Sequence, residues 1–394
     1  MRKVTIGDLG DIYTGNTPSK KNVEFYDSED IMFIKPDILD FDINTINESN
    51  EYVSERAREK ARIIPKDSLL VSCIGNIGKL GINKKEAAFN QQINAIVHNE
   101  KIVSSRYLAY LIKYNQKKLE AIANAPVVPI INKTQFSNFE LFIHENLETQ
   151  NKIVEVLDKA QSLIDKKKEQ IELLDELVKS RFIEMFGDIR TNKKRWEEEE
   201  LSNLLINIDS GKSFVCEGYE RKGDYPAILK LSAVTYGVYK PLENKALINE
   251  EEFIDNMEVK EGDLLFTRKN TPELVGMSAY VYKTTPNLMM PDLIFRLNTN
   301  ENCNKIYLWK LINNEMFREK IKMISNGSAK SMSNISKQNL MKLKIPVPPI
   351  ELQNEFAEFV TQTDSIRSKM EASLSELEDN FNSLMQKAFK PELF

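Results

Sequence analysis

The sequence contains few of the residues that most often bind metals or carry out covalent catalysis. Its 394 residues include only three cysteines and two histidines, His98 and His144. Cys73, Cys216 and Cys303 are odd in number and far apart, so they predict buried free thiols in a reducing cytoplasm and no disulfide framework. Because the sequence has no Cys/His cluster, we expect no metal site.

Long apolar runs and nucleotide-binding motifs are also missing. No stretch approaches 18 uncharged apolar residues and the N-terminus lacks a signal-peptide core, so we expect no membrane association. Segment Gly75–Lys79 (GNIGK) lacks the spacing of a phosphate loop; it is either a turn between strands or a backbone approach to phosphate. Pro348-Pro349 lacks the neighbouring amide and aromatic residues that amino-methyltransferases use. We therefore predict no catalytic residues.

Charge is distributed unevenly along the chain. The net charge of −5 is unusual for a protein that binds DNA, which normally needs a basic surface. Residues 1–146 are neutral overall, while residues 147–190, 191–267 and 345–394 carry −2, −6 and −5. Residues 268–344 carry +8. This stretch predicts a basic binding surface, with chance clustering on a solvated face as the alternative.

Two heptad patterns give the chain an internal repeat. Apolar residues recur at spacings of three and four over about 150–186 and again over about 353–389, which is typical of coiled-coil helices. The two patterns align without a gap at a shift of 203 residues. The residues predicted to pair the helices are Ile153, Leu157, Ile164, Ile171, Leu174, Phe356, Val360, Leu374, Leu377 and Phe381. An antiparallel pair would bury both seams within one chain; a coiled coil that only dimerises the protein is the alternative.

Each long helix follows a globular segment of about 145 residues. Short β-rich runs such as Ile31–Ile34 and Ala279–Tyr282 alternate with helical stretches such as Ser105–Ala123 and Lys305–Ile324. The fold class predicted is α+β: two globular modules separated by two long antiparallel coiled-coil helices, with an internal pseudo-two-fold repeat. The predicted domains are residues 1–146 (first module), 147–190 (first long helix), 191–349 (second module) and 350–394 (second long helix).

Polar and basic residues gather in the loops of both modules. Lys and Arg side chains suit phosphates and guanine edges, whereas Asn and Gln suit adenine edges. The residues predicted on this basis to contact DNA are Asn16, Thr17, Ser19, Lys20, Ser72, Asn76, Lys79, Asn90, Gln91, Lys212, Ser213, Arg268, Lys269, Asn270, Asn326, Ser328 and Lys330. A solvated loop surface without a ligand is the alternative interpretation.

The doubled architecture resembles the specificity subunits of type I restriction–modification systems. The resemblance rests on Gly15–Pro18 (GNTP), Ile345–Gln353 (IPVPPIELQ) and Phe186–Asp188 (FGD), within a tandem order of target-recognition domain, helix, target-recognition domain, helix. It covers essentially the whole chain. The sequence departs from the pattern at Phe142–Leu147, where the second module has its proline segment, and at Lys390–Glu392, where the family often has a glycine.

The resemblance implies a sequence-specific DNA-binding subunit with no catalytic activity of its own. Each target-recognition domain would read one half of a bipartite site in double-stranded DNA, and the helices would set the spacer between the halves. Two methyltransferase subunits carrying S-adenosylmethionine would dock on the helices and methylate a flipped adenine. Motor-endonuclease subunits can join for cleavage. Two alternatives stay open: a recognition subunit of a methylation-only system, and a coiled-coil protein-binding adaptor without DNA contact.

Overall fold

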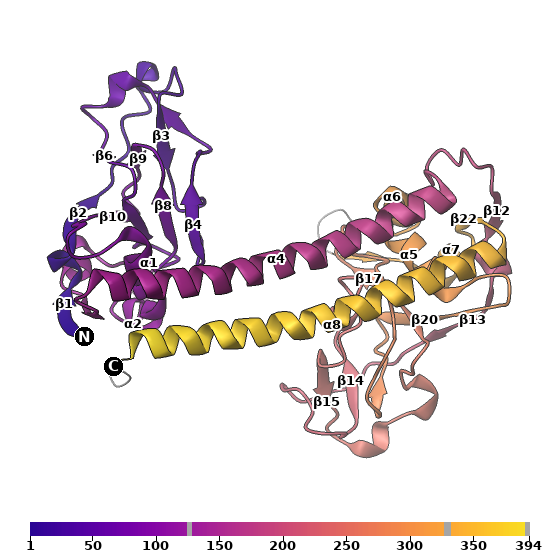
Figure 1. The fold of residues 1–394 in the computed structure, drawn as a ribbon. Coiled ribbons are helices and arrows are strands. Elements are labelled where there is room, and N and C mark those ends of the chain that lie inside the picture. Colours follow the sequence, from indigo (N-terminus) through magenta and orange to yellow (C-terminus); the bar gives the residue numbers. More distant parts are fainter. Residues whose placement is uncertain (124–127, 327–331, 391–394) are drawn as a thin grey trace. The chain divides into compact units, whose positions relative to one another are not determined.

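A computed structural model of the chain describes residues 1–123, 128–326 and 332–390. The chain divides into two compact units, each of which contains one globular module and part of both long helices (Figure 1). Unit 1 comprises Met1–Glu169 with Glu371–Phe394, and unit 2 comprises Gln170–Met370. No helix in the described ranges is long and apolar enough to cross a membrane.

Unit 1 is built on a five-stranded sheet in the order β2-β10-β7-β8-β4. A second sheet has the order β5-β3-β9-β6, and β1 pairs with β11. The strands are β1 (Arg2–Thr5), β2 (Gly10–Thr14), β3 (Ile31–Ile34), β4 (Ile43–Ile46), β5 (Tyr52–Val53), β6 (Ile63–Ile64), β7 (Leu69–Ser72), β8 (Leu80–Asn83), β9 (Ala87–Phe89), β10 (Ile93–His98) and β11 (Glu140–Ile143). The short helices are α1 (Ser105–Tyr114), α2 (Gln116–Ala121) and α3 (Lys133–Ser137).

Unit 2 repeats this plan with a four-stranded sheet in the order β13-β20-β16-β18. A second sheet has the order β15-β14-β19, and β12 pairs with β22 and β17 with β21. The strands are β12 (Glu197–Glu200), β13 (Leu205–Ser210), β14 (Ala227–Leu229), β15 (Asn244–Ala246), β16 (Leu264–Thr267), β17 (Lys269–Asn270), β18 (Ser278–Tyr280), β19 (Leu288–Met289), β20 (Ile294–Thr299), β21 (Ser333–Asn334) and β22 (Lys344–Val347). The short helices are α5 (Lys305–Asn313), α6 (Glu315–Met323) and α7 (Lys337–Met341).

The shared strand framework confirms the α+β fold class and the internal repeat. The order β2-β10-β7-β8 has its counterpart in β13-β20-β16-β18, and the parallel pair β3–β9 has its counterpart in β14–β19. Gly15 and Gly211 follow β2 and β13. A Cβ atom at these positions would lie 2.2 Å from the carbonyl oxygen of Asn90 and 2.1 Å from that of Met290. Since backbone cannot approach any side chain so closely, both modules need glycine at this point.

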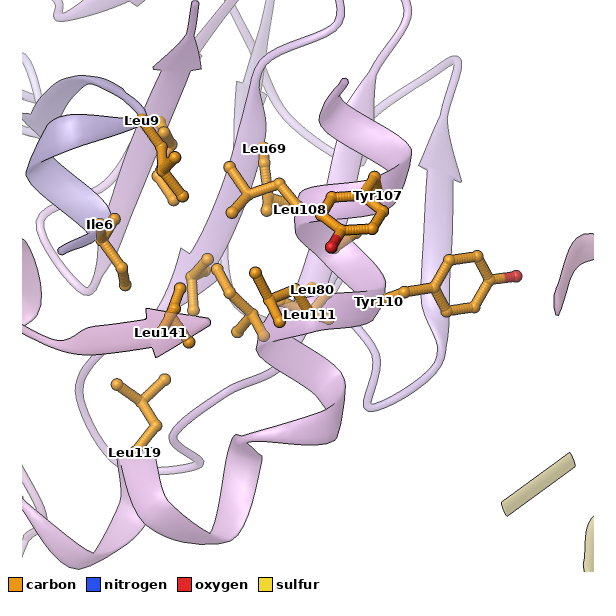
Figure 2. Close-up of a cluster of buried hydrophobic side chains, with 14 of the residues drawn as sticks. Ile6, Leu9, Leu69, Leu80, Tyr107, Leu108, Tyr110, Leu111, Leu119 and Leu141 are labelled. Atoms are coloured by element: carbon orange, nitrogen blue, oxygen red, sulfur yellow. The ribbon is translucent and has the colours of Figure 1, made fainter. Parts of the chain in front are cut away.

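The core of the first module lies between α1 and the five-stranded sheet. Figure 2 shows Leu108 and Leu111 of α1 together with Leu69 of β7 and Leu80 of β8 in one cluster. All four side chains are fully buried or nearly so. Burying a leucine side chain contributes about 1.5 to 3 kcal/mol to stability, so this layer is what fixes the sheet against the helix.

The helical stretches expected over 105–123 and 305–324 are each formed by two short helices. Asn115 separates α1 from α2, and its Nδ2 donates to the carbonyl oxygen of Leu111 at 2.9 Å. Asn314 separates α5 from α6, and its side chain accepts a hydrogen bond from the backbone of Met316 at 3.0 Å. Asparagine competes for backbone hydrogen bonds and favours caps, so it ends both helices, at positions one residue apart in the repeat.

The two long helices begin in the same way. They are α4 (Leu147–Phe186) and α8 (Ile350–Phe389), each of 40 residues and offset by 203. The buried Gln150 donates from Nε2 to the carbonyl oxygen of His144 at 2.7 Å. The buried Gln353 donates likewise to that of Pro348 at 2.8 Å. Each helix therefore starts three residues before the glutamine at which the sequence pattern begins.

The antiparallel pairing of α4 and α8 is confirmed. Their ion pairs are Lys168–Glu378 in unit 1, and Asp175–Arg367 and Arg181–Glu355 in unit 2, so the α8 number falls as the α4 number rises. Of the predicted pairing residues, Leu157, Ile164 and Phe381 are buried in the core of unit 1, with Ile153, Leu374 and Leu377 packed against it, and Phe356 and Val360 are buried in unit 2. Ile171 and Leu174 are half-buried.

Each long helix ends in an aromatic cluster. The ring of Phe186 lies 4.9 Å from that of Tyr307 and 5.2 Å from that of Phe356, all in unit 2. Phe389, the matching residue of α8, lies 5.5 Å from Tyr107 in unit 1. The helix that leaves the first module is therefore fixed in unit 2, and the helix that leaves the second module is fixed in unit 1.

The three cysteines are free. Burial raises the pKa of the Cys73 and Cys303 thiols to about 12. Cys216 is only half-buried, which corrects the expectation that all three are buried, because it packs at the edge of a small cluster formed by Ile228, Leu247 and Met289.

Candidate nucleic-acid interface

Three loops leave the same end of the main sheet in unit 1. Strands β2 and β7 both pair antiparallel with β10, so both of them end where β10 begins. Loops 15–20, 73–79 and 90–92 therefore meet at this end. Nearly all residues of the first module that the sequence analysis assigned to DNA lie on these loops, although they come from three separate parts of the sequence.

Side-chain hydrogen bonds connect the first loop to its surroundings. Thr17 Oγ1 donates to Gln91 Oε1 at 2.8 Å. Asn16 Nδ2 donates to the carbonyl oxygen of Lys60, and Asn16 Oδ1 accepts from the backbone of Arg62, both at 2.6 Å. The exposed Lys60 and Arg62 thus belong to this surface, and the sequence analysis missed them. Their basic character was visible in the sequence, but only the contacts of Asn16 show where they lie.

Two of the predicted residues of the first module, Ser72 and Asn90, are buried and hydrogen-bonded within the loops. Ser72 is fully buried; its hydroxyl donates to the carbonyl oxygen of Asn76 and accepts from the backbone of Lys79. Asn90 is buried as well, and its Nδ2 donates to Gln92 Oε1 at 3.0 Å. The DNA contacts of Ser72 and Asn90 stay predictions; in the structure their polar atoms bind loop backbone and side chains.

The remaining predicted residues of the first module stay accessible. Ser19, Lys20, Asn76 and Gln91 are exposed, and Lys79 is half-buried. The Lys79 ammonium lies 5.6 Å from the centre of the Phe41 ring. Segment Gly75–Lys79 is part of the turn that joins antiparallel β7 and β8, and Gly75 and Gly78 take positive φ there. The segment is therefore a turn between strands.

Unit 2 has three loops in the same places. Loops 211–213, 268–277 and 290–293 meet where β13 and β16 end and β20 begins. Lys212 and Lys269 are exposed. Ser213 donates from its hydroxyl to Asp292 Oδ1, which joins two of the loops.

A further strand segment borders these loops in unit 2. The exposed Asn326 and the half-buried Asn334 exchange two backbone hydrogen bonds of 2.8 Å, and β21 pairs with β17. Asn270 in β17 is buried and donates to Thr235 Oγ1 at 3.1 Å, and its contact with DNA stays a prediction. Ser328 and Lys330 lie outside the described residues.

Arg268 is held in a fixed orientation at this site. Its Nε and Nη2 atoms both donate to Asn334 Oδ1 at 3.3 Å. Its guanidinium carbon lies 5.1 Å from the centre of the Phe295 ring. The side chain is half-buried, next to the exposed Lys269. A guanidinium plane held in this way suits a base edge, and an exposed ammonium group suits a phosphate.

Several cations of the basic stretch have structural roles. Arg296 forms ion pairs with Asp209 at 3.0 Å and Asp263 at 3.1 Å. The buried Arg318 donates to the carbonyl oxygens of Glu273 and Val275, and burial lowers the pKa of its guanidinium. The charge of +8 over residues 268–344 therefore overstates the basic surface that is free to meet a ligand.

The histidines have structural surroundings. The Tyr107 hydroxyl and His144 Nδ1 are hydrogen-bonded at 2.9 Å, and burial lowers the pKa of both His98 and His144. In the part of the chain that the structure describes, no group of three or more His, Cys, Asp or Glu side chains is placed to hold a metal ion.

Comparisons with known proteins agree with this geometry. Residues 1–174 and 193–379 match the family model of the type I restriction modification DNA specificity domain. The type I restriction enzyme EcoEI specificity subunit of Escherichia coli is 29% identical over 184 residues, which are 45% of this chain and 31% of that protein. The type I restriction enzyme EcoKI specificity subunit of Escherichia coli K12 is 22% identical over 357 residues, 85% of this chain and 76% of that protein.

A solved structure shares the fold. The crystal structure of the type I restriction–modification S subunit from M. genitalium has a TM-score of 0.60 at 16% identity and covers 98% of this chain and 96% of that one. In sequence, the chain spans only 31% to 52% of the length of the first four curated relatives that it matches.

Proposed function

Because the chain belongs to the family of type I restriction modification DNA specificity domains, we propose that it is the non-catalytic, DNA-reading subunit of a type I restriction–modification complex. Each unit reads one half of a bipartite site in double-stranded DNA through the loops at the end of its main sheet. One observation carries the proposal: two modules with the same strand framework gather polar and basic loops at the same sheet end but fill them with different residues.

The proposal includes partners on the long helices. Two methyltransferase subunits dock there, bind S-adenosylmethionine and methylate a flipped adenine in each half-site, and motor-endonuclease subunits join for cleavage. The helix pair sets the spacer between the half-sites. The complex acts in the cytoplasm, where the free thiols of this chain stay reduced. A methylation-only system would use this chain in the same way, without the motor-endonuclease.

Exposed apolar residues at matching helix positions support two equivalent docking points. Leu163 of α4 is 54% exposed, and Ile366 of α8, offset by 203 residues, is 47% exposed. We expect L163E and I366E each to weaken one of the two methyltransferase contacts, because a charged side chain cannot be buried against an apolar partner surface without cost. Sedimentation should then show complexes with one methyltransferase in place of two. L173E, which changes another exposed leucine of α4 without a counterpart in α8, is the matched control. Full occupancy in both variants would remove Leu163 and Ile366 from the interface.

Exchange of one module tests the DNA-reading function. Residues 197–344 are replaced by the matching segment of a relative that modifies a different site, and methylated adenines are mapped in genomic DNA. We expect one half-site to change and the other to stay, since each unit has its own core and its own set of loops. A complex that keeps its original site after the exchange would contradict the proposal and favour an adaptor that leaves sequence choice to its partners.

A further inference from the structure

The residue that follows the central strand differs between the units, although its backbone surroundings match. Cys73 follows β7, and its carbonyl oxygen accepts a hydrogen bond from the backbone of Ile131 at 2.9 Å. Arg268 follows β16, and its carbonyl oxygen accepts from the backbone of Ile335 at 2.7 Å. Ile131 and Ile335 both precede a short helix, α3 or α7. Cys73 and Arg268 thus occupy the same position of the repeat.

The neighbour on the adjacent strand differs as well. In unit 1 the position next to Cys73 holds Asn94, whose Nδ2 lies 3.3 Å from the Cys73 sulfur, and Cys73 is buried. In unit 2 the matching position of β20 holds Phe295, which carries the Arg268 guanidinium on its ring. Unit 1 therefore closes this position with a buried neutral thiol, while unit 2 places a half-exposed cation there.

The contacts of Arg268 leave part of its guanidinium free. Asn334 Oδ1 accepts one hydrogen bond from Nε–H and one from Nη2–H. Within the described residues, Nη1 has no hydrogen-bond partner. Its two hydrogens and the second hydrogen of Nη2 are therefore available to donate to a ligand. The Phe295 ring and Asn334 fix the plane of the group before any ligand arrives, which reduces the conformational entropy lost on binding.

We propose that Arg268 is the base-reading residue of unit 2 and donates from Nη1 and Nη2 to O6 and N7 of a guanine in the major groove. O6 and N7 of guanine are neighbouring acceptors on one base edge, and the two parallel N–H donors of a guanidinium group match them. The inference rests on the proposed function, and it assigns one base of one half-site. Cys73 cannot make this contact, so the matching position of unit 1 supplies no equivalent guanine contact.

The test uses the full chain assembled with its methyltransferase, with methylated adenines mapped and binding measured on sites that differ at single positions. In R268A, preference for guanine at one position of the unit 2 half-site should fall about 5- to 150-fold. The other half-site should stay unchanged. R268K should lose the same preference while keeping most of the affinity, because lysine keeps the charge but lacks the planar fork.

K269A is the matched control, one residue away and exposed. It should weaken binding to all sequences alike and lower the slope of affinity against salt by about one, as loss of a phosphate contact does. N334A, which leaves Arg268 in place but removes its acceptor, should reduce the same guanine preference by a smaller factor. Circular dichroism checks that the variants fold.

The outcomes separate the two hypotheses. If the unaltered complex methylates no interrupted site, the proposed function fails. If it methylates one and R268A keeps every base preference, the function stands and the inference is overturned. R268A that behaves like K269A also overturns the inference, since Arg268 would then be a phosphate contact.

Discussion

Replacement of Phe186 by alanine is expected to lower the free energy of unfolding of unit 2 by about 3 to 5 kcal/mol. The ring is buried among Tyr307, Phe356 and Phe182, at centroid distances of 4.9, 5.2 and 5.0 Å. Alanine loses the transfer free energy of the ring and leaves a cavity that the interlocking aromatic rings cannot fill without breaking their own contacts. The loss is large because the residue fixes the end of α4.

Tryptophan fluorescence measures this loss in unit 2 alone. Both tryptophans of the chain, Trp196 and Trp309, lie in this unit, so their signal in a urea titration follows its unfolding. Trp196 donates to the carbonyl oxygen of Phe186 at 2.9 Å, a backbone contact that the substitution keeps. L177A on the same helix is the control: Leu177 is 48% exposed, so its loss should cost about 0.5 kcal/mol or less. Equal destabilisation by both variants would show that the aromatic cluster does not fix α4.

The long helices could be predicted from the sequence because their periodicity repeats over ten turns and because the two copies support each other. The helices start at Leu147 and Ile350, three residues before Gln150 and Gln353, at which the apolar pattern begins. These two glutamines bind carbonyl oxygens of the preceding segment, a tertiary contact that no periodicity reports. The breaks at Asn115 and Asn314 could not be predicted, because asparagine occurs both inside helices and at caps, and only the local hydrogen bonds decide between them.

The sequence showed which loops are polar, but not how their side chains are used. In the structure these loops meet at one end of each main sheet. The sequence does not reveal which polar atoms already have partners within the protein, and so it assigned Ser72 and Asn90 to the ligand. It also counted Arg296 and Arg318 as part of a basic surface, although both bind acceptors inside unit 2.

Residues 1–190 without the rest of the chain are expected to form a symmetric dimer that directs methylation to a palindromic, interrupted site. In unit 1 the first half of α4 packs on Phe381, Met385 and Phe389 of α8. A second copy of α4 offers Val178, Phe182 and Phe186 at the same positions of the repeat. These side chains are apolar and similar in total volume, so they can close the core of unit 1. A closed two-fold pair presents two identical modules, which is why the site becomes palindromic.

The dimer should be weaker than the native pairing. The ion pair Lys168–Glu378 keeps an acidic partner, since Asp175 stands at the position that matches Glu378. Arg181 loses Glu355 and meets Lys152 instead, a like charge.

Association also costs translational and rotational entropy that the covalent link avoids. We therefore expect a dimer whose population depends on concentration in sedimentation experiments. R181L should tighten it, because leucine is the residue at the matching position 384, where it packs against the core of unit 1. A folded monomer at every concentration, or an asymmetric methylated site in cells that express only this half with its methyltransferase, would show that the two helices are not interchangeable.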